Sequence, residues 1–340
     1  MFQDLRQPDF ERLRKTLFNK KADAVPLIEL GIHPIIKEKI IKRPLNSLQD
    51  EVNFMRSMGY DYIKIQPVID LRLGRKAATE SGAIDRTWAS EHSGVITNWE
   101  EFEKYNWPRK ENIDYSNLEN ARNLLPEEMG IIGQYGDIFT SVWEMMGFET
   151  FAMAMFEQPD LVEALFEKVG GLILSMFDNM SDMDWVGALW YSDDIAYSSG
   201  LMVSPDFLRT HFFPILRHIG DLCQKRSIPF IYHTDGKLWD VLDDIINCGV
   251  TALHPIEPKS MDIYELDQKY GSKLCFCGGI EVDLLARGKE FEIKDLVNKY
   301  LRDIAVRGGY CIGSSNSIPE YVSLKNYFAM VETILKNGNI

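Results

Sequence analysis

The sequence is poor in several features, and each absence excludes a class of protein. Its five cysteines, an odd number, all lie in the second half of the 340 residues, which argues against a disulfide-held secreted scaffold and favours a reducing compartment. No stretch approaches the roughly 20 apolar residues of a membrane span, and the polar amino terminus lacks a signal-peptide core. Basic residues are outnumbered 37 to 51, for a net charge of −14. We therefore expect a cytoplasmic protein without nucleic-acid or membrane partners.

The chain contains short apolar runs that alternate with longer helical patterns, and no repeat or linker interrupts them. Eight runs are typical of parallel strands covered on both faces: 24–30, 62–66, 130–135, 185–192, 228–233, 251–255, 273–278 and 309–313. This alternation predicts an α/β fold, a (β/α)8 TIM barrel forming a single domain over residues 1–340. Residues 69–129 are the longest connection and predict extra helices inserted between strands 2 and 3. A doubly wound sheet is the alternative, but no G-x-G-x-x-G follows the first run.

Apolar residues at helical spacing predict the covering helices. They lie at 45–58, 116–125, 160–180, 204–226, 237–247 and 290–305. The fourth helix opens with Ser204 as N-cap and Pro205 at the first helical position, and Gly249 suits the left-handed position after the fifth.

Polar and ionisable residues follow the predicted strands, where a barrel places its active site. They are Glu29 and His33; Gln66; Gln134, Tyr135 and Asp137; Asp193 and Asp194; His233 and Asp235; His254 and Glu257; Glu281 and Asp283; and Ser314, Ser315 and Asn316. Half of the six histidines fall in this set, which is more than turn formation requires. We therefore expect a functional cavity at this end of the barrel.

His233 and Asp235 follow one strand, and Glu257 follows the next. Three interpretations stay open. The three side chains would form a nitrogen and oxygen metal site with an open position, for a divalent ion such as zinc. They would equally form a metal-free acid/base group in which Asp235 fixes the imidazole. In the third interpretation Asp235 and Gly236 form a turn, and His233 belongs to the core.

Asp193 and Asp194 form a like-charge pair near the cavity. Crowding of two carboxylates raises one pKa, which suits proton transfer. Neighbouring side chains of a strand point to opposite faces, so one of the pair faces the cavity and Asp193 is also a candidate helix cap.

Other clusters are less informative. Cys275 and Cys277 lie two residues apart in an apolar run and are interpreted as small buried hydrophobes rather than a metal pair. The basic residues Arg72, Arg75 and Lys76 would hold an acidic group or form a solvated loop. Aromatic residues near the strand ends, including Tyr135 and Trp190, are candidates for the wall of a pocket.

Four segments in the second half carry a family resemblance. They read ALWYSDDIAYSSGLMVSPDFLRTHFFPIL, IPFIYHTDGKLWDVLDDIINCGVTALHPIEP, LCFCGGIEVDLL and GGYCIGSSNSIPEYVSLKNY, and IIGQYGDIFTSVWEMMGFE precedes them. In this order they resemble the uroporphyrinogen decarboxylase superfamily over residues 129–335. The resemblance implies the same barrel and two chemistries, decarboxylation of a porphyrinogen and methyl transfer between a corrinoid protein and a thiol.

The resemblance also suggests how site residues correspond. Decarboxylases carry arginines in the first-strand segment, where this chain has Glu29 and His33. The zinc ligands of the methyltransferases correspond to His233 for a histidine, Asp235 for a cysteine, Glu257 for a glutamate, and Asn316 (with a gap, Cys311) for a cysteine.

The leading expectation is methyl transfer linked to a corrinoid partner protein, acting on a small-molecule substrate at an atypical His/Asp/Glu site. Asp194 or Asp193 would be the acid or base, with His233 oriented by Asp235. The metal candidates are His233, Asp235 and Glu257. Residues expected to contact substrate are Glu29, His33, Tyr135, Trp190, Glu257, Ser315 and Asn316. A metal-free decarboxylase and a non-catalytic tetrapyrrole-binding module are the alternatives, and a monomer and a homodimer both stay open.

Overall fold

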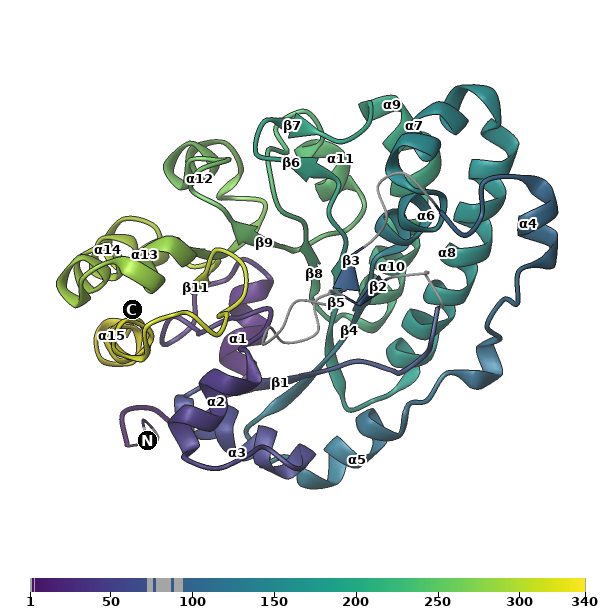
Figure 1. Cartoon of the computed structure of the whole chain (residues 1–340). Coiled ribbons are helices and arrows are strands. Elements are labelled where there is room, and N and C mark those ends of the chain that lie inside the picture. Colours follow the sequence, from purple (N-terminus) through teal and green to yellow (C-terminus); the bar gives the residue numbers. More distant parts are fainter. Residues whose placement is uncertain (1, 3, 72–75, 78–86, 89–93, 340) are drawn as a thin grey trace.

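The computed structural model describes residues 2, 4–71, 76–77, 87–88 and 94–339. Its strands are β1 (Tyr62–Ile65), β2 (Lys76–Ala77), β3 (Thr87–Trp88), β4 (Gly130–Gly136), β5 (Val186–Ser192), β6 (Ala196–Tyr197), β7 (Gly200–Leu201), β8 (Phe230–His233), β9 (Ala252–Ile256), β10 (Cys275–Ile280) and β11 (Tyr310–Ser314). Within the described residues, seven of them form one parallel sheet in the order β1-β4-β5-β8-β9-β10-β11. The sheet curls, as Figure 1 shows, and the fold is TIM-barrel-like.

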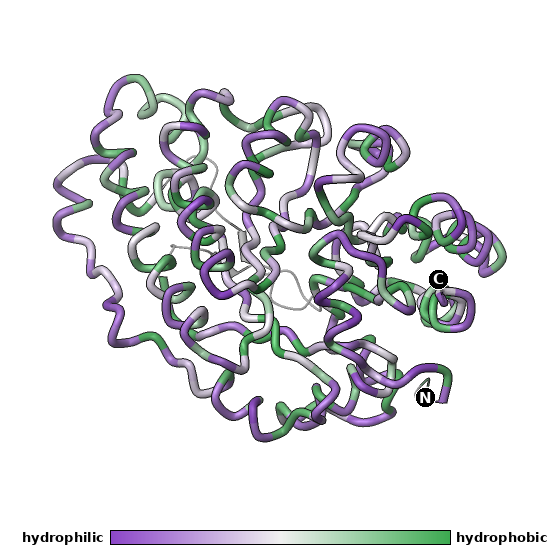
Figure 2. Tube along the Cα trace, turned by 180° about the vertical axis from the view of Figure 1, so that it is seen from behind, coloured by the Kyte–Doolittle hydropathy of each residue, from purple (hydrophilic) through white to green (hydrophobic). Residues whose placement is uncertain are grey.

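Helices cover the outside of this sheet. They are α1 (Phe10–Leu17), α2 (Pro34–Ile41), α3 (Leu48–Met58), α4 (Trp99–Lys104), α5 (Ser116–Leu124), α6 (Ile138–Met146), α7 (Phe148–Glu157), α8 (Pro159–Asp182), α9 (Pro205–Phe207), α10 (Phe213–Arg226), α11 (Leu242–Asn247), α12 (Ile263–Tyr270), α13 (Val282–Arg287), α14 (Glu290–Asp303) and α15 (Leu324–Asn337). Short turns η1 (Lys110–Asn112), η2 (Leu208–Phe212) and η3 (Ala305–Arg307) complete them. Figure 2 shows hydrophobic residues along the strands and inner helix faces and hydrophilic residues outside.

The predicted first strand, 24–30, differs from the prediction. It lies beside β11, where the Ile28 N–H donates to the Ile312 carbonyl and the Ile312 N–H donates to the Pro26 carbonyl, but it makes only isolated bridges. Pro26 has no N–H to donate, and toward β1 the Glu29 N–H is bonded to the Tyr62 hydroxyl instead of a backbone carbonyl. Gly313 permits the close approach, because a Cβ there would lie 1.7 Å from the Ile28 carbonyl oxygen. Seven strands are therefore confirmed where eight were predicted.

The helical predictions hold with two corrections. Ser204 accepts the N-cap bond from Phe207, as predicted, but the predicted helix 204–226 contains the π turn η2 just before Pro214. Proline lacks the N–H that a regular helix needs, and this accounts for the interruption. The helix predicted at 237–247 begins only at Leu242, because the Lys237 N–H is bonded to the Tyr197 carbonyl.

The long connection between β1 and β4 contains β2, β3, α4, η1 and α5 in its described parts. Across the described residues, no helix combines the length and apolar character needed to cross a membrane.

Candidate functional site

Three predicted side chains meet where β5 and β8 end. Asp194 follows β5, His233 is the last residue of β8, and Asp235 comes two residues later. One carboxylate oxygen or ring nitrogen from each lies within 4.8 Å of the others. The Asp235 N–H donates to Asp194 Oδ1 at 2.8 Å, and His233 Nε2 lies 3.8 Å from the same oxygen. Parallel strands bring these residues together, because their carboxyl ends share one edge of the sheet.

Glu257 adds a third carboxylate next to this group. It follows β9, and its Oε2 accepts hydrogen bonds from the Gly236 N–H at 3.3 Å and the Ser260 hydroxyl at 2.6 Å. Burial, then Asp194 and Glu257, raise the pKa of Asp235 to about 8. Burial and then Glu257 also raise the pKa of Asp194. The carboxylates therefore disfavour one another's charge, and a proton or a cation would relieve the repulsion.

Asp235 has its two oxygens in different environments. Oδ2 accepts a hydrogen bond from the Asn316 amide at 2.7 Å. Oδ1 is buried and has no hydrogen-bond partner among the described residues. Asn316 thus holds the carboxylate with one oxygen available to a ligand, and this contact joins the residues that follow β8 to those that follow β11.

The imidazole of His233 contacts a second histidine, His254. Its Nδ1 lies 2.7 Å from Nδ1 of His254, so one ring donates and the other accepts. If Nδ1 of His233 carries the shared proton, the Nε2 lone pair of His233 faces Asp194, which is the arrangement of a metal ligand. If Nδ1 of His254 carries it instead, His233 has its own proton on Nε2 and donates it toward Asp194. Burial, then the charge of Lys64, lower the pKa of His233 to about 3. The imidazole is therefore neutral near pH 7.

Lys64 is a site residue to which sequence reasoning assigns no role. It lies on β1, donates to Gln134 Oε1 at 3.3 Å and places its ammonium 5.4 Å from the Trp190 ring centroid. Burial and then Lys37 lower its pKa to about 7. The signal that marks it is a single cation inside an otherwise apolar strand. The basic residues Arg72 and Arg75, and the side chain of Lys76, lie outside the described part.

Asp193 takes the capping role that was the alternative to catalysis. Its carboxylate accepts the Phe139 and Thr140 N–H groups at 2.6 and 3.0 Å, at the start of α6, as well as the Thr140 and Tyr191 hydroxyls. Burial and then Asp137 raise its pKa to about 8. Successive side chains of the strand thus diverge, with Asp193 toward α6 and Asp194 toward His233.

Four other predicted substrate contacts lie in different places. Buried Glu29 accepts the Ser314 N–H at 2.9 Å and the Ser314 hydroxyl, and burial raises its pKa to about 8. His33 is the N-cap of α2 through its Nδ1. Trp190 is fully buried and meets the His254 ring edge-on at 4.9 Å, and Tyr135 is half-buried on β4. Their contact with substrate stays a prediction.

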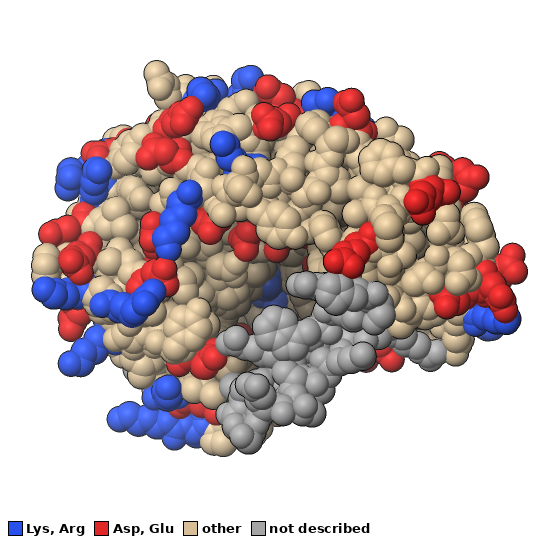
Figure 3. Space-filling view, turned by 45° about the horizontal axis from the view of Figure 1, so that its top comes forward, with Lys and Arg blue, Asp and Glu red and all other residues tan. Residues whose placement is uncertain are grey.

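A cavity of about 350 Å³ adjoins the site and is shared by three predicted residues, Glu257, Ser315 and Asn316. Lys259, Glu281 and Asp283 also line it, and Lys259 is paired with Asp283 at 2.7 Å. Figure 3 turns the end of the sheet that carries β6 and β7 toward the viewer, and a hollow opens there with acidic side chains near its rim and basic atoms inside. The volume suits a small molecule.

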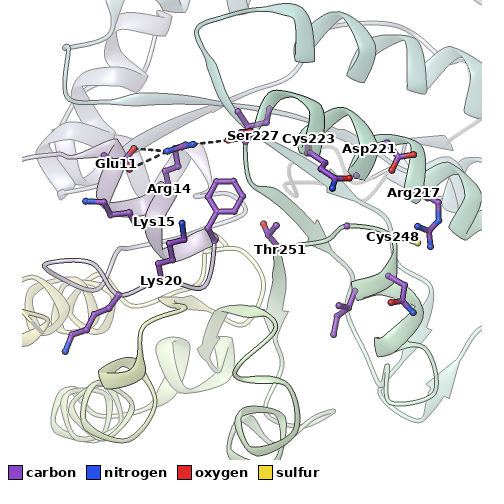
Figure 4. Close-up of a pocket in the computed structure, with 18 residues that line it drawn as sticks. Glu11, Arg14, Lys15, Lys20, Arg217, Asp221, Cys223, Ser227, Cys248 and Thr251 are labelled. Carbon is purple, nitrogen blue, oxygen red and sulfur yellow. Dashed lines mark hydrogen bonds and ion pairs between the residues drawn. The ribbon is translucent and has the colours of Figure 1, made fainter.

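A larger cavity, about 930 Å³, lies at the opposite end and contains none of the predicted residues. Figure 4 shows basic residues on two sides of this cavity. Arg14 and Lys15 of α1, and Lys20 in the turn after it, lie on one side. Arg217 of α10 and Ser227, the C-cap of α10, lie on the other. Arg14 donates to the Ser227 carbonyl at 2.9 Å. Helices end at this side of the barrel, and cations there complement the negative ends of their dipoles. The basic lining therefore has a structural explanation.

The comparison with protein families identifies the class of protein. Residues 91–336 match the family model described as uroporphyrinogen decarboxylase (URO-D). This is more than half of the chain, which therefore belongs to the uroporphyrinogen decarboxylase family, as the sequence resemblance indicated. No curated protein matches the chain.

Two solved structures are similar to this chain to different degrees. A methyltransferase from Methanosarcina mazei has a TM-score of 0.71 at 15% identity and covers 95% of this chain and 97% of its own. A putative vitamin-B12 independent methionine synthase from Listeria monocytogenes has a TM-score of 0.43 at 10% identity, with 98% of both chains covered. The first of these likenesses supports the TIM-barrel-like architecture.

Proposed function

We propose that this chain is an enzyme that transfers a methyl group from a corrinoid protein partner to a small-molecule acceptor. The observation that carries the proposal is the convergence of Asp194, His233 and Asp235 at the carboxyl ends of β5 and β8. Family membership and the fold shared with a methyltransferase support the reaction class.

The site suits a divalent cation held by nitrogen and oxygen. His233 Nε2, Asp194 Oδ1 and the unpartnered Asp235 Oδ1 are hard or borderline donors of the kind that zinc, manganese and iron accept. Burial is the first cause of the raised pKa values of both aspartates, and a cation would offset the repulsion that Glu257 adds at Asp194 and that Asp194 and Glu257 add at Asp235. When bound, such an ion supplies Lewis acidity that activates the acceptor group.

The protein's own residues position the reactants. Asn316 fixes Asp235, and His254 fixes the ring of His233. Glu257 keeps its carboxylate against the Gly236 N–H, and with Ser315 it lines the cavity in which the acceptor would lie. When no cation is bound, Asp194 would be the general acid or base, because its side chain is 48% exposed and reaches solvent, whereas Asp193 positions α6.

The test is a methyl-transfer assay with a methylcorrinoid protein as donor. His233→Ala and Asp194→Ala should each reduce turnover by about 100-fold or more, as expected for loss of an acid/base group or metal ligand. Asp295→Ala, an exposed site on α14, is the matched control and should keep wild-type activity. Metal analysis of protein purified without chelator should find one divalent ion in wild type and none in His233→Ala. Full activity of both site variants would refute the proposal.

A metal-free decarboxylase is the second candidate, and one observation favours it. Asp235 with a pKa of about 8 is a carboxylic acid at neutral pH, and the charge of Lys64 on β1, whose pKa is about 7, acts on the neighbouring site residue His233. A neutral acid can protonate the carbanion that remains after loss of carbon dioxide. Formation of coproporphyrinogen from uroporphyrinogen, without metal and without a corrinoid protein, would favour this reaction over methyl transfer.

A further inference from the structure

Three cysteine side chains gather inside the sheet, away from the site described above. Cys275 and Cys277 lie on β10, and Cys311 lies directly opposite Cys277 on β11. Residues two apart in a strand share a face, so all three thiols point the same way. Their sulfur atoms lie within 4.8 Å of one another, and all three residues are fully buried. We refer to these residues as the thiol cluster.

The thiol cluster is separate from the carboxylate site. Cys311 lies three residues before the end of β11 at Ser314. At about 3.3 Å per residue, the cluster is roughly 10 Å below the strand ends. The sequence alone showed the pair on β10, and only the register of β10 with β11 adds the third thiol. The inference below does not rest on the proposed function.

The number of thiols and their burial restrict what can bind. Structural zinc sites have four ligands, whereas the cluster offers three among the described residues. A buried complex with net charge is costly, because the low-dielectric interior does not solvate it. Three thiolates leave a net charge of −2 with a monovalent ion, −1 with a divalent ion and zero with a trivalent centre. A trivalent, thiophilic, three-coordinate atom therefore matches the cluster in both ligand number and charge.

We propose that the thiol cluster binds trivalent arsenic, taken up as arsenite. In neutral arsenous acid the arsenic carries three hydroxyl groups. Each thiol replaces one of them, so three arsenic–oxygen and three sulfur–hydrogen bonds break, and three arsenic–sulfur bonds form. The three protons leave with the three hydroxyls as water, and no atom is oxidised or reduced. The product is neutral and needs no fourth ligand.

The experiment uses the full-length protein, reduced with a phosphine because dithiols would compete for arsenic. After incubation with arsenite and desalting, native mass spectrometry should show one arsenic atom gained and three hydrogens lost. X-ray absorption at the arsenic edge should show three sulfur neighbours and no oxygen. Cys311→Ala should lose the bound arsenic, and Cys223→Ala, another buried cysteine outside the cluster, should bind it like wild type.

Several results would overturn the inference. Arsenic that is lost on desalting, that keeps oxygen neighbours in the wild type, or that Cys311→Ala retains would each count against it. The wild-type spectrum decides the question if Cys311→Ala does not fold. The inference includes access to the thiols in the native protein, so failure to take up arsenite also contradicts it. Equal retention of cadmium by the same three sulfurs would refute the charge argument.

Discussion

Replacing Asp194 by Asn would test whether the carboxylates at the strand ends act as one coupled group. The amide has the same shape, and its oxygen can still accept the 2.8 Å hydrogen bond from the Asp235 N–H. The change therefore removes a charge and little else. After burial, the charge of Asp194 is what raises the pKa of Asp235, so the variant should lower that pKa from its value of about 8.

The size of this effect follows from the distance between the carboxylate oxygens of Asp194 and Asp235. The two carboxylate oxygens lie within 4.8 Å of each other, and two unit charges at that limit repel by roughly 3.5 kcal/mol at an effective dielectric constant of about 20. Asp194 is 48% exposed, so solvent screening reduces this value. We expect the pKa of Asp235 to fall by about one unit or more, equivalent to about 1.4 kcal/mol.

Carbon-13 NMR of the side-chain carboxyl groups, titrated from about pH 5 to about pH 9, measures this shift. Asp295→Asn, on the exposed face of α14, is the control and should leave the Asp235 titration unchanged. If catalysis uses protonated Asp235, the alkaline limb of the activity profile should move to lower pH by the same amount in Asp194→Asn. An unchanged Asp235 titration in this variant would refute the coupling and, with it, the argument for a cation at the site.

Three further substitutions, one of them with a matched control, test the fold around the site. The folded-state pKa of Glu29 is raised from 4.5 to about 8, so its contribution to stability is present below about pH 4.5 and is lost as pH rises toward about 8. In urea unfolding, Glu29→Gln should remove several kcal/mol of this pH dependence, and an unchanged dependence of the unfolding free energy on pH would contradict the burial argument. Asp193→Ala should lower the free energy of unfolding by about 2–4 kcal/mol, because the α6 N–H groups lose their acceptor; wild-type stability would exclude the capping role. Gly313→Ala should destabilise the protein by about 1–3 kcal/mol or more through the clash with the Ile28 carbonyl, whereas Gly171→Ala, with open space around it, should be neutral or stabilising by up to about 1 kcal/mol. Thermal melts of the two variants would show whether 24–30 lies against β11.

The sequence predicts most strands because each is a short apolar run between turn residues. Seven of the eight runs form the parallel sheet at nearly the predicted positions. The run 24–30 is also mostly apolar but is no regular strand, because Pro26 has no N–H to donate and because a strand needs hydrogen-bond partners on the neighbouring backbone. Here a side chain, the Tyr62 hydroxyl, replaces the backbone partner on one side.

The helix at 204–226 illustrates a local signal that was available in the sequence. Pro214 lies inside the predicted helix, and proline interrupts the hydrogen-bond ladder. Its effect could be predicted from the sequence, whereas the π turn that accommodates it could not, because neighbouring packing selects among several local solutions.

The sequence by itself determined that His233, Asp235, Glu257 and Asn316 follow strands, since polarity at the end of an apolar run can be identified locally. Only the tertiary structure decided which of these groups touch. It paired Asn316 with Asp235, grouped Asp194 with His233, and turned Asp193 away toward α6. The physical reason is that sheet register and side-chain direction depend on segments far apart in the chain, so contacts between strand ends cannot be read from spacing alone. The same register brought Cys311 to the two cysteines of β10.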